Sequence, residues 1–302
     1  MSRELSDQAA VEIARLASDI YYAREVEPND PGYCLFIGSG CSLPAAPSSS
    51  KLTEKLVEEF YGKIPSNERK SRFEREFPSY VGEGHITLEA ICEAYKEMRG
   101  PDALLRSLKA KFGQRGKFHE GYAVLGDLVK EGYFKAIFTT NIDTLIEDTF
   151  KKKELDFDLI EDLSDYQSRT PSTSAARPCV YKLHGSYDHP DPNVSDRDLQ
   201  QLHPAKSRHL QFFFELNSFI FVGYSARDMD IFFSLSKVET FVRERLRMYS
   251  FTLSGDSPDM KKLLRRYNSI RGNIALGNVD NGGTLLFALK NEIKNVEEKA
   301  KK

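Results

Sequence analysis

The sequence lacks a long apolar run, paired cysteines and an excess of charge of either sign, and each absence excludes a class of protein. No apolar stretch approaches the ~20 residues that a membrane-spanning helix requires, so we expect a cytoplasmic protein without a membrane span. Lys and Arg total 43 against 45 Asp and Glu, which gives a formal net charge of −2. This balance provides no general attraction to nucleic acid or to an anionic membrane surface.

The cysteines are few and scattered, and none forms a CxxC pair. They are Cys34, Cys41, Cys92 and Cys179. This spacing predicts neither a disulfide framework nor a zinc tetrad, so we expect free thiols and no bound metal. Cys179 precedes His184 in sequence, which raises the alternative of a thiol nucleophile with a histidine base. Because Cys179 is expected to begin the strand that ends at His184, the two would lie too far apart, and buried packing is the favoured interpretation.

The sequence does contain a series of short apolar runs, each followed by polar residues or glycine. We expect strands at residues 33–37, 136–139, 180–183, 219–222 and 248–253, and a sixth near Ile274. Stretches with helical periodicity separate them, and this alternation predicts a doubly wound, Rossmann-like α/β fold with a parallel sheet covered on both faces. With 302 residues, 40% of them hydrophobic, the chain fits a single domain over 1–302.

The interval between the first two expected strands is far longer than one crossover helix requires. We therefore expect a helical insertion subdomain at 62–132. Helical spacing recurs at 51–61, 88–98, 103–112 and 122–130, and the start of the chain reads as an amphipathic helix. Residues 278–302 are expected to form a charged C-terminal helix whose end, 289–302, is solvated, whereas 164–178 and 187–196 are expected to be irregular loops.

A run of small residues, GSGCS, directly follows the first expected strand and contains Gly38, Ser39, Gly40 and Ser42. Such residues let backbone N–H groups approach a phosphate at the start of a helical segment. The dinucleotide fingerprint GxGxxG is incomplete, because Leu43 occupies the position of its third glycine. A tight turn without a ligand is therefore the alternative interpretation of this loop.

Polar residues or glycines also end the next three expected strands. They are Thr139, Thr140, Asn141 and Asp143 in FTTNID, His184 and Gly185 in YKLHGS, and Gly223 and Ser225 in VGYS. Ligands of doubly wound folds bind at the carboxyl ends of the parallel strands. The four segments together therefore predict one binding site.

Each of these residues also has a purely structural interpretation. Asn141 fits a helix cap, and Ser225 with Asp228 fits a capping box. His184 could be a hydrogen-bonded histidine of the core. These alternatives stay open at the level of single motifs.

In this order, GSGCS, FTTNID, KLHG and VGYS resemble the motifs of the sirtuin-like domain, in particular the NAD-hydrolysing branch of bacterial antiphage defence that lacks the zinc module. The resemblance covers about residues 30–255. It implies that Gly38, Ser39, Gly40, Ser42 and Thr139 bind NAD, that Gly223 and Ser225 contact the adenosine ribose, and that Asn141, Asp143 and His184 are catalytic. Ser39 stands where the family usually has Ala, and Thr140 where it has Gln.

The function that the resemblance implies is that of an NAD glycohydrolase, with NAD as substrate and no metal. Nicotinamide leaves a cationic pyridinium as a neutral base, so the chemistry requires stabilisation of a ribosyl cation rather than a general acid. Asp143 would act through its charge or orient the nicotinamide, Asn141 would place water, and His184 has an ordinary pKa of ~6.5 that suits a base. The alternative is a non-catalytic sensor of NAD or of an ADP-ribose derivative.

The resemblance also implies a NAD-depleting effector of antiphage defence that stays inactive until triggered. We therefore expect a homo-oligomer and a partner subunit, either a ring-forming ATPase or a phage-sensing protein. A basic stretch late in the chain raises nucleic-acid binding as an alternative, although a solvated helix face or a protein interface is favoured. It consists of Arg243, Arg245, Arg247, Lys261, Lys262, Arg265, Arg266 and Arg271.

Overall fold

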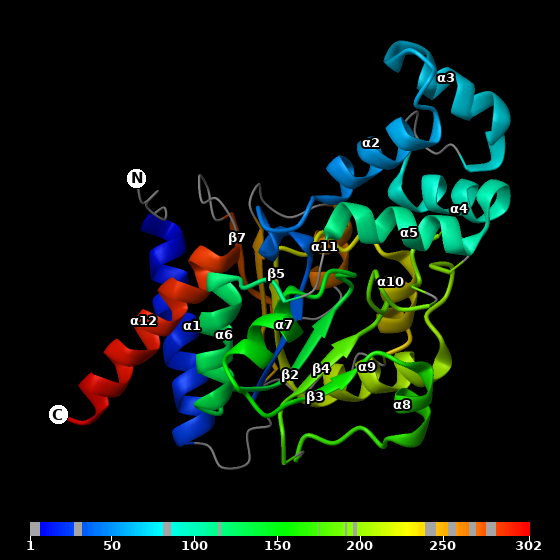
Figure 1. The fold of residues 1–302 in the computed structure, drawn as a ribbon. Coiled ribbons are helices and arrows are strands. Elements are labelled where there is room, and N and C mark those ends of the chain that lie inside the picture. The colour runs from blue at the N-terminus through cyan, green and yellow to red at the C-terminus, as the bar shows by residue number, and fades with distance from the viewer. Residues whose placement is uncertain are drawn as a thin grey trace.

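The computed structural model describes residues 7–26, 32–80, 86–113, 116–174, 176–190, 192–195, 198–238, 246–252, 258–265, 270–275 and 282–302. In these residues seven strands form one parallel sheet in the order β3-β4-β2-β1-β5-β6-β7, with helices on both faces (Figure 1). The predicted doubly wound α/β fold is thus confirmed.

The strands lie close to their predicted positions. They are β1 (Tyr33–Ile37), β2 (Phe134–Thr139), β3 (Asp158–Ile160), β4 (Cys179–Lys182), β5 (Ser218–Val222), β6 (Met248–Thr252) and β7 (Ile270–Ala275). The analysis of the sequence missed β3, because this edge strand buries only Ile160 and leaves no apolar run. From β1 the chain passes to β2 on one side and later returns to β5 on the other. The topological switch point therefore lies between the carboxyl ends of β1 and β5.

The helices of the structure show which of them apolar periodicity in the sequence was sufficient to predict. They are α1 (Asp7–Glu25), α2 (Ser49–Phe60), α3 (Ser66–Glu76), α4 (Leu88–Arg99), α5 (Pro101–Phe112), α6 (Glu120–Lys130), α7 (Leu145–Lys152), α8 (Leu163–Ser168), α9 (Pro204–Leu216), α10 (Met229–Ser236), α11 (Pro258–Arg265) and α12 (Gly282–Ala300). The sequence analysis gave no ranges for α3, α7, α8, α9, α10 and α11. Helix α3 buries only Phe73, so its sequence carries no stripe, and α8 occupies the start of the segment expected to be irregular.

Strands β1, β4, β5 and β6 bury both of their faces, which explains their continuous apolar runs. In β1, Tyr33, Leu35 and Ile37 belong to a core shared with α1, α6 and α12. Cys34 and Phe36 point the opposite way, into a core shared with α9 and α10. A central sheet between two helical layers follows from this alternation.

The C-terminal helix differs from the prediction of a solvated helix end. Leu285, Leu289 and Ile293 recur at helical spacing and are buried where α12 packs against α1 and α6. Lys290 adds an ion pair with Asp127 of α6 at 2.5 Å. Only part of the charged surface of α12 is therefore free for solvent, and residues 278–281 lie outside the described residues.

Helices α2, α4 and α5 pack on one another beyond the carboxyl ends of the strands (Figure 1). Serine and threonine caps begin two of them: Ser48 accepts the N–H of Lys51, and Thr87 accepts that of Ala90. Helix α6 instead packs against α7 and α12. The subdomain boundary at 62–132 remains a prediction. Within the described residues, no helix has both the length and the apolar character needed to cross a membrane.

Candidate functional site

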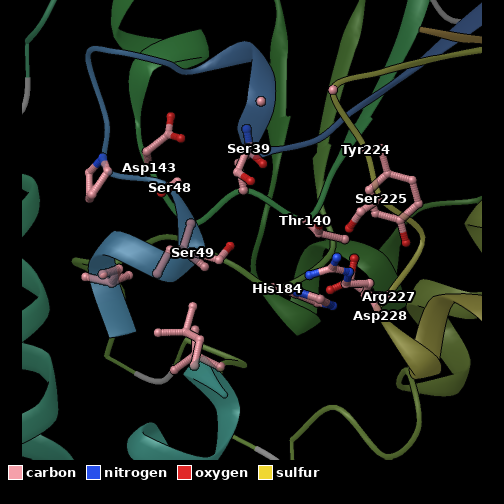
Figure 2. A pocket seen from close by; sticks show the side chains of 18 of the residues that line it. Ser39, Ser48, Ser49, Thr140, Asp143, His184, Tyr224, Ser225, Arg227 and Asp228 are labelled. Carbon is pink, nitrogen blue, oxygen red and sulfur yellow. The ribbon is translucent and has the colours of Figure 1, made fainter. Parts of the chain in front are cut away.

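A cleft with a cavity volume of about 540 Å³ lies at the carboxyl ends of β1, β2, β4 and β5 (Figure 2). All four predicted motifs contribute residues to its lining. These are Ser39, Gly40, Thr140, Asn141, Asp143, His184, Gly223 and Ser225. The starts of α2 and α4 and the end of α5 form the opposing wall, with Ser49, Leu52, Leu88, Glu89 and Phe112. The cleft therefore occupies the position where doubly wound folds bind nucleotides.

The glycines of the first and fourth motifs lie in contact at the switch point. A Cβ atom at Gly38 would lie 2.4 Å from the carbonyl oxygen of Gly223, and one at Gly223 would lie 2.7 Å from the backbone nitrogen of Cys41. Gly223 also has a φ of +62°, which disfavours any other residue. The Gly40 N–H donates to the Gly223 carbonyl at 3.1 Å. The close approach of the two loops explains why glycine occupies these positions. Phosphate binding by the N–H groups of these glycines stays a prediction.

Ser42 and Thr139 lie behind the wall of the cleft rather than in its lining. Both are 1% exposed. The Asn141 side-chain amide donates to Ser42 Oγ at 3.1 Å, and Ser42 Oγ in turn shares a hydrogen bond of 2.9 Å with the hydroxyl of Tyr122. The backbone N–H of Asn141 donates to Thr139 Oγ1 at 3.0 Å, and Thr139 donates to the carbonyl of Ile37 at 2.8 Å. Both residues, predicted to bind NAD, thus hold Asn141 in place.

These hydrogen bonds orient the Asn141 amide. Since its nitrogen donates to Ser42, its oxygen remains as an acceptor of this cleft-lining residue. Asn141 does not cap α7, so that alternative is wrong. The N-cap residue is Thr144, and the backbone N–H of Leu145 donates to Asp143 Oδ1 at 3.1 Å.

A buried ion pair supports the backbone of Asp143. Lys182 Nζ lies 2.8 Å from Glu147 Oε1, and both side chains are 1% exposed. The same ammonium donates to the carbonyl oxygen of Asp143. Burial raises the pKa of Glu147, and the charge of Lys182 opposes that rise. Lys182 therefore ties the segment that carries Asn141 and Asp143 to helix α7.

His184 is buried, yet it lines the cleft and pairs with a carboxylate that the sequence analysis missed. Its Nε2 lies 3.0 Å from Asp230 Oδ2. Burial alone would lower the pKa of His184, but the hydrogen bond to Asp230 and the charges of Asp230 and Asp228 raise it above the ordinary value. In the tautomer in which Asp230 accepts this hydrogen bond, the proton of the neutral imidazole sits on Nε2. Nδ1 makes no hydrogen bond to the described residues and retains its lone pair.

Asp228 and Ser225 do not form the capping box that was the alternative to a site. Helix α10 begins at Met229 with Asp228 as N-cap residue, and the Asp228 side chain accepts no hydrogen bond from the helix. Both Ser225 and Asp228 line the cleft instead. The signal for Asp230 was present in VGYSARDMD, but only tertiary contact joins it to a histidine 46 residues away.

The cysteines and the basic stretch do not join this site. All four cysteines are buried, and burial raises the pKa of Cys179, which begins β4 at the end opposite His184. The described residues contain no group of three or more His, Cys, Asp or Glu side chains that could hold a metal. In the basic stretch, Arg247 pairs with Asp19. The residues Arg243, Arg245 and Arg266 and the side chains of Arg265 and Arg271 lie outside what the structure describes.

Three comparisons with known proteins were made. Two solved structures align with the chain: one from work on the mechanism and regulation of Sir2 enzymes (14% identity, 95% of this chain and 98% of that chain covered, TM-score 0.46), and Sir2Af2 bound to a myristoylated histone peptide (13% identity, 96% and 99% covered, TM-score 0.40). No curated protein matches the chain. A model of the SIR2-like domain matches residues 135–271, less than half of the 302 residues, including the second, third and fourth motifs. Over those residues, the chain is similar to the SIR2-like domain.

Proposed function

We propose that this protein binds NAD in the cleft and hydrolyses the bond between nicotinamide and ribose. The observation that carries the proposal is the pair formed by His184 and Asp230, which leaves Nδ1 of a cleft-lining histidine with a lone pair close to the motif that contains Asn141. The cavity volume of about 540 Å³ lies in the range of small-molecule sites. Similarity to the SIR2-like domain supports a role in NAD chemistry.

The reaction converts NAD⁺ and water into nicotinamide, ADP-ribose and a proton. When the bond between C1′ and the pyridinium nitrogen breaks, its electron pair stays on that nitrogen, and nicotinamide leaves as a neutral molecule. Positive charge then develops on the ribosyl group. The carboxylates of Asp143 and Asp228, which line the cleft, supply negative charge that favours this transition state.

Water completes the reaction by forming a bond to C1′. The Asn141 amide oxygen accepts one hydrogen bond from this water, and His184 Nδ1 accepts its proton. The Nε2–H of the resulting imidazolium still donates its hydrogen bond to Asp230, whose negative charge balances the positive charge of the ring. In this mechanism His184 is the base, Asn141 places the nucleophile, and Asp230 positions the base.

The test uses the full chain with NAD, and chromatography follows nicotinamide and ADP-ribose. We expect His184→Ala and Asn141→Ala to abolish turnover while circular dichroism shows the wild-type fold. His189→Ala is the matched control, because His189 bonds to Asp162 and does not line the cleft. Full activity of His184→Ala would refute the assignment. NAD binding without any product would favour the sensor, and release of the acyl group from an acylated peptide would favour a deacylase.

We further propose a biological setting from the resemblance of the four motifs. In it the protein is the NAD-depleting effector of an antiphage system, assembled as a homo-oligomer and controlled by an ATPase or a phage-sensing partner. Sedimentation of the purified chain, alone and with a partner encoded beside it, tests this setting. A monomer that is fully active alone would refute this mode of control.

A further inference from the structure

Arg227 is placed at the cleft by an unusual turn of the backbone. The residue before it, Ala226, has a φ of +57°, in the left-handed region, and the residue after it is the N-cap of α10. The Arg227 side chain is exposed, lines the cleft, and makes no ion pair or hydrogen bond with any described residue. Its guanidinium is therefore available to a ligand.

The charges around the cleft make this arginine distinctive. The described lining contains the carboxylates of Glu89, Asp143 and Asp228, and Arg227 is its only Lys or Arg. Lys206 acts on His184 electrostatically, but it is buried and donates to the carbonyl of Leu183 at 2.7 Å. A ligand that carries phosphates would meet repulsion from these three carboxylates and attraction from one side chain.

The loops that were expected to hold phosphates already use several of their backbone donors. The N–H groups of Gly38 and Gly40 donate to the carbonyls of Val222 and Gly223, and that of Ser42 donates to the carbonyl of Ser39. Neutral backbone dipoles alone would thus have to offset the repulsion of the carboxylates. A cationic side chain in the lining would therefore strengthen the binding of a phosphate in this cleft.

We propose that Arg227 binds the diphosphate of the dinucleotide and so sets the direction in which the ligand lies in the cleft. The inference rests on the proposed function. Figure 2 shows Arg227, Asp228 and His184 on one side of the pocket and Asp143 on the other. The diphosphate lies beside Arg227, and the cationic nicotinamide end points toward Asp143. A guanidinium suits this role because its forked N–H groups bind two phosphate oxygens together.

Isothermal titration of the full chain with ADP-ribose and with adenosine tests this role. We expect Arg227→Gln to raise the Kd for ADP-ribose about tenfold to a hundredfold and to change the Kd for adenosine less than twofold. Arg227→Lys should recover part of the loss, since it retains the charge without the fork. Raising the salt concentration should weaken ADP-ribose binding more in the wild type than in Arg227→Gln.

Arg106→Gln is the matched control, because Arg106 is an exposed arginine of α5 outside the cleft. An unchanged Kd for ADP-ribose in Arg227→Gln would overturn the inference and leave the proposed hydrolysis untouched. An equal loss of adenosine binding would also overturn it, because the effect would not then depend on phosphate. If the wild type binds neither NAD nor ADP-ribose, the proposed function fails together with the inference.

Discussion

Replacement of Lys182 by methionine tests how the buried ion pair supports the site. Methionine has a similar length and removes only the ammonium, which lies 2.8 Å from Glu147 Oε1 and also bonds to the carbonyl of Asp143. Because both charged side chains are 1% exposed, water cannot replace the lost partner. The variant leaves the carboxylate of Glu147 and the carbonyl of Asp143 buried without the ammonium that both contact.

The structure gives the scale of the expected loss. Removing one member of a buried ion pair lowers the free energy of unfolding by about 3 to 5 kcal/mol. The double variant Lys182→Met/Glu147→Leu removes both charges of the pair. The Asp143 carbonyl still lacks its partner, which lowers the free energy of unfolding by about 1 to 3 kcal/mol. The double variant should therefore be the more stable by about 2 kcal/mol. Its NAD cleavage should still fall at least about tenfold, because the backbone that presents Asp143 has lost its anchor.

The cost should depend on pH in a defined direction. Burial raises the pKa of Glu147 in the folded protein, and loss of Lys182 raises it further, because the lysine charge opposes the effect of burial. A raised carboxyl pKa favours the folded state below the unfolded value of about 4.3, and this benefit is lost as pH rises through the folded pKa. Lys182→Met should thus be less destabilised at pH 5 than at pH 8.

Urea unfolding followed by circular dichroism at both pH values measures these differences. Lys70→Met is the control, since the exposed Lys70 to Glu74 pair, at 3.7 Å within one helix, should contribute only about 0.3 to 0.5 kcal/mol. Either of two results refutes the reasoning. One is a loss below about 1 kcal/mol for Lys182→Met. The other is a double variant that is no more stable than the single one.

Three further predictions follow from the site. Since His184 acts as a base only when deprotonated and its pKa is raised by Asp230, Asp230→Asn should shift the acidic limb of the kcat/KM profile to lower pH and reduce kcat at least about tenfold; an unmoved limb would contradict this. Tyr122→Phe should cost about 1 kcal/mol in urea unfolding and lower kcat more than it changes KM, whereas an unchanged kcat would separate its hydroxyl from catalysis. Gly223→Ala should lower Tm more than Gly132→Ala, since both have positive φ but only the former places a Cβ within 3 Å of the backbone; equal shifts would disprove the contact argument.

The layers of the fold were predictable because they follow from local patterns. Runs buried on both faces mark the parallel strands, and helical periodicity marks α1, α2 and α4, since each pattern lies in the residues of the element itself. Helix α3 and strand β3 escaped because α3 buries only Phe73 and β3 only Ile160. Elements that bury so few side chains depend on contacts with neighbouring parts of the fold, and a local sequence pattern does not describe those contacts.

The four motifs GSGCS, FTTNID, KLHG and VGYS follow successive strands. Because parallel strands of one sheet present their carboxyl ends at the same edge, this order was sufficient to predict that the motifs meet at one cleft. Tertiary structure alone decided which side chains face it. Ser42 and Thr139 turn inward to hold Asn141, while Asp230 reaches His184 across 46 residues of chain. The physical reason is that strand ends are positioned by backbone pairing, which the sequence pattern encodes. The direction and protonation of each side chain depend instead on neighbours that only the folded chain brings together.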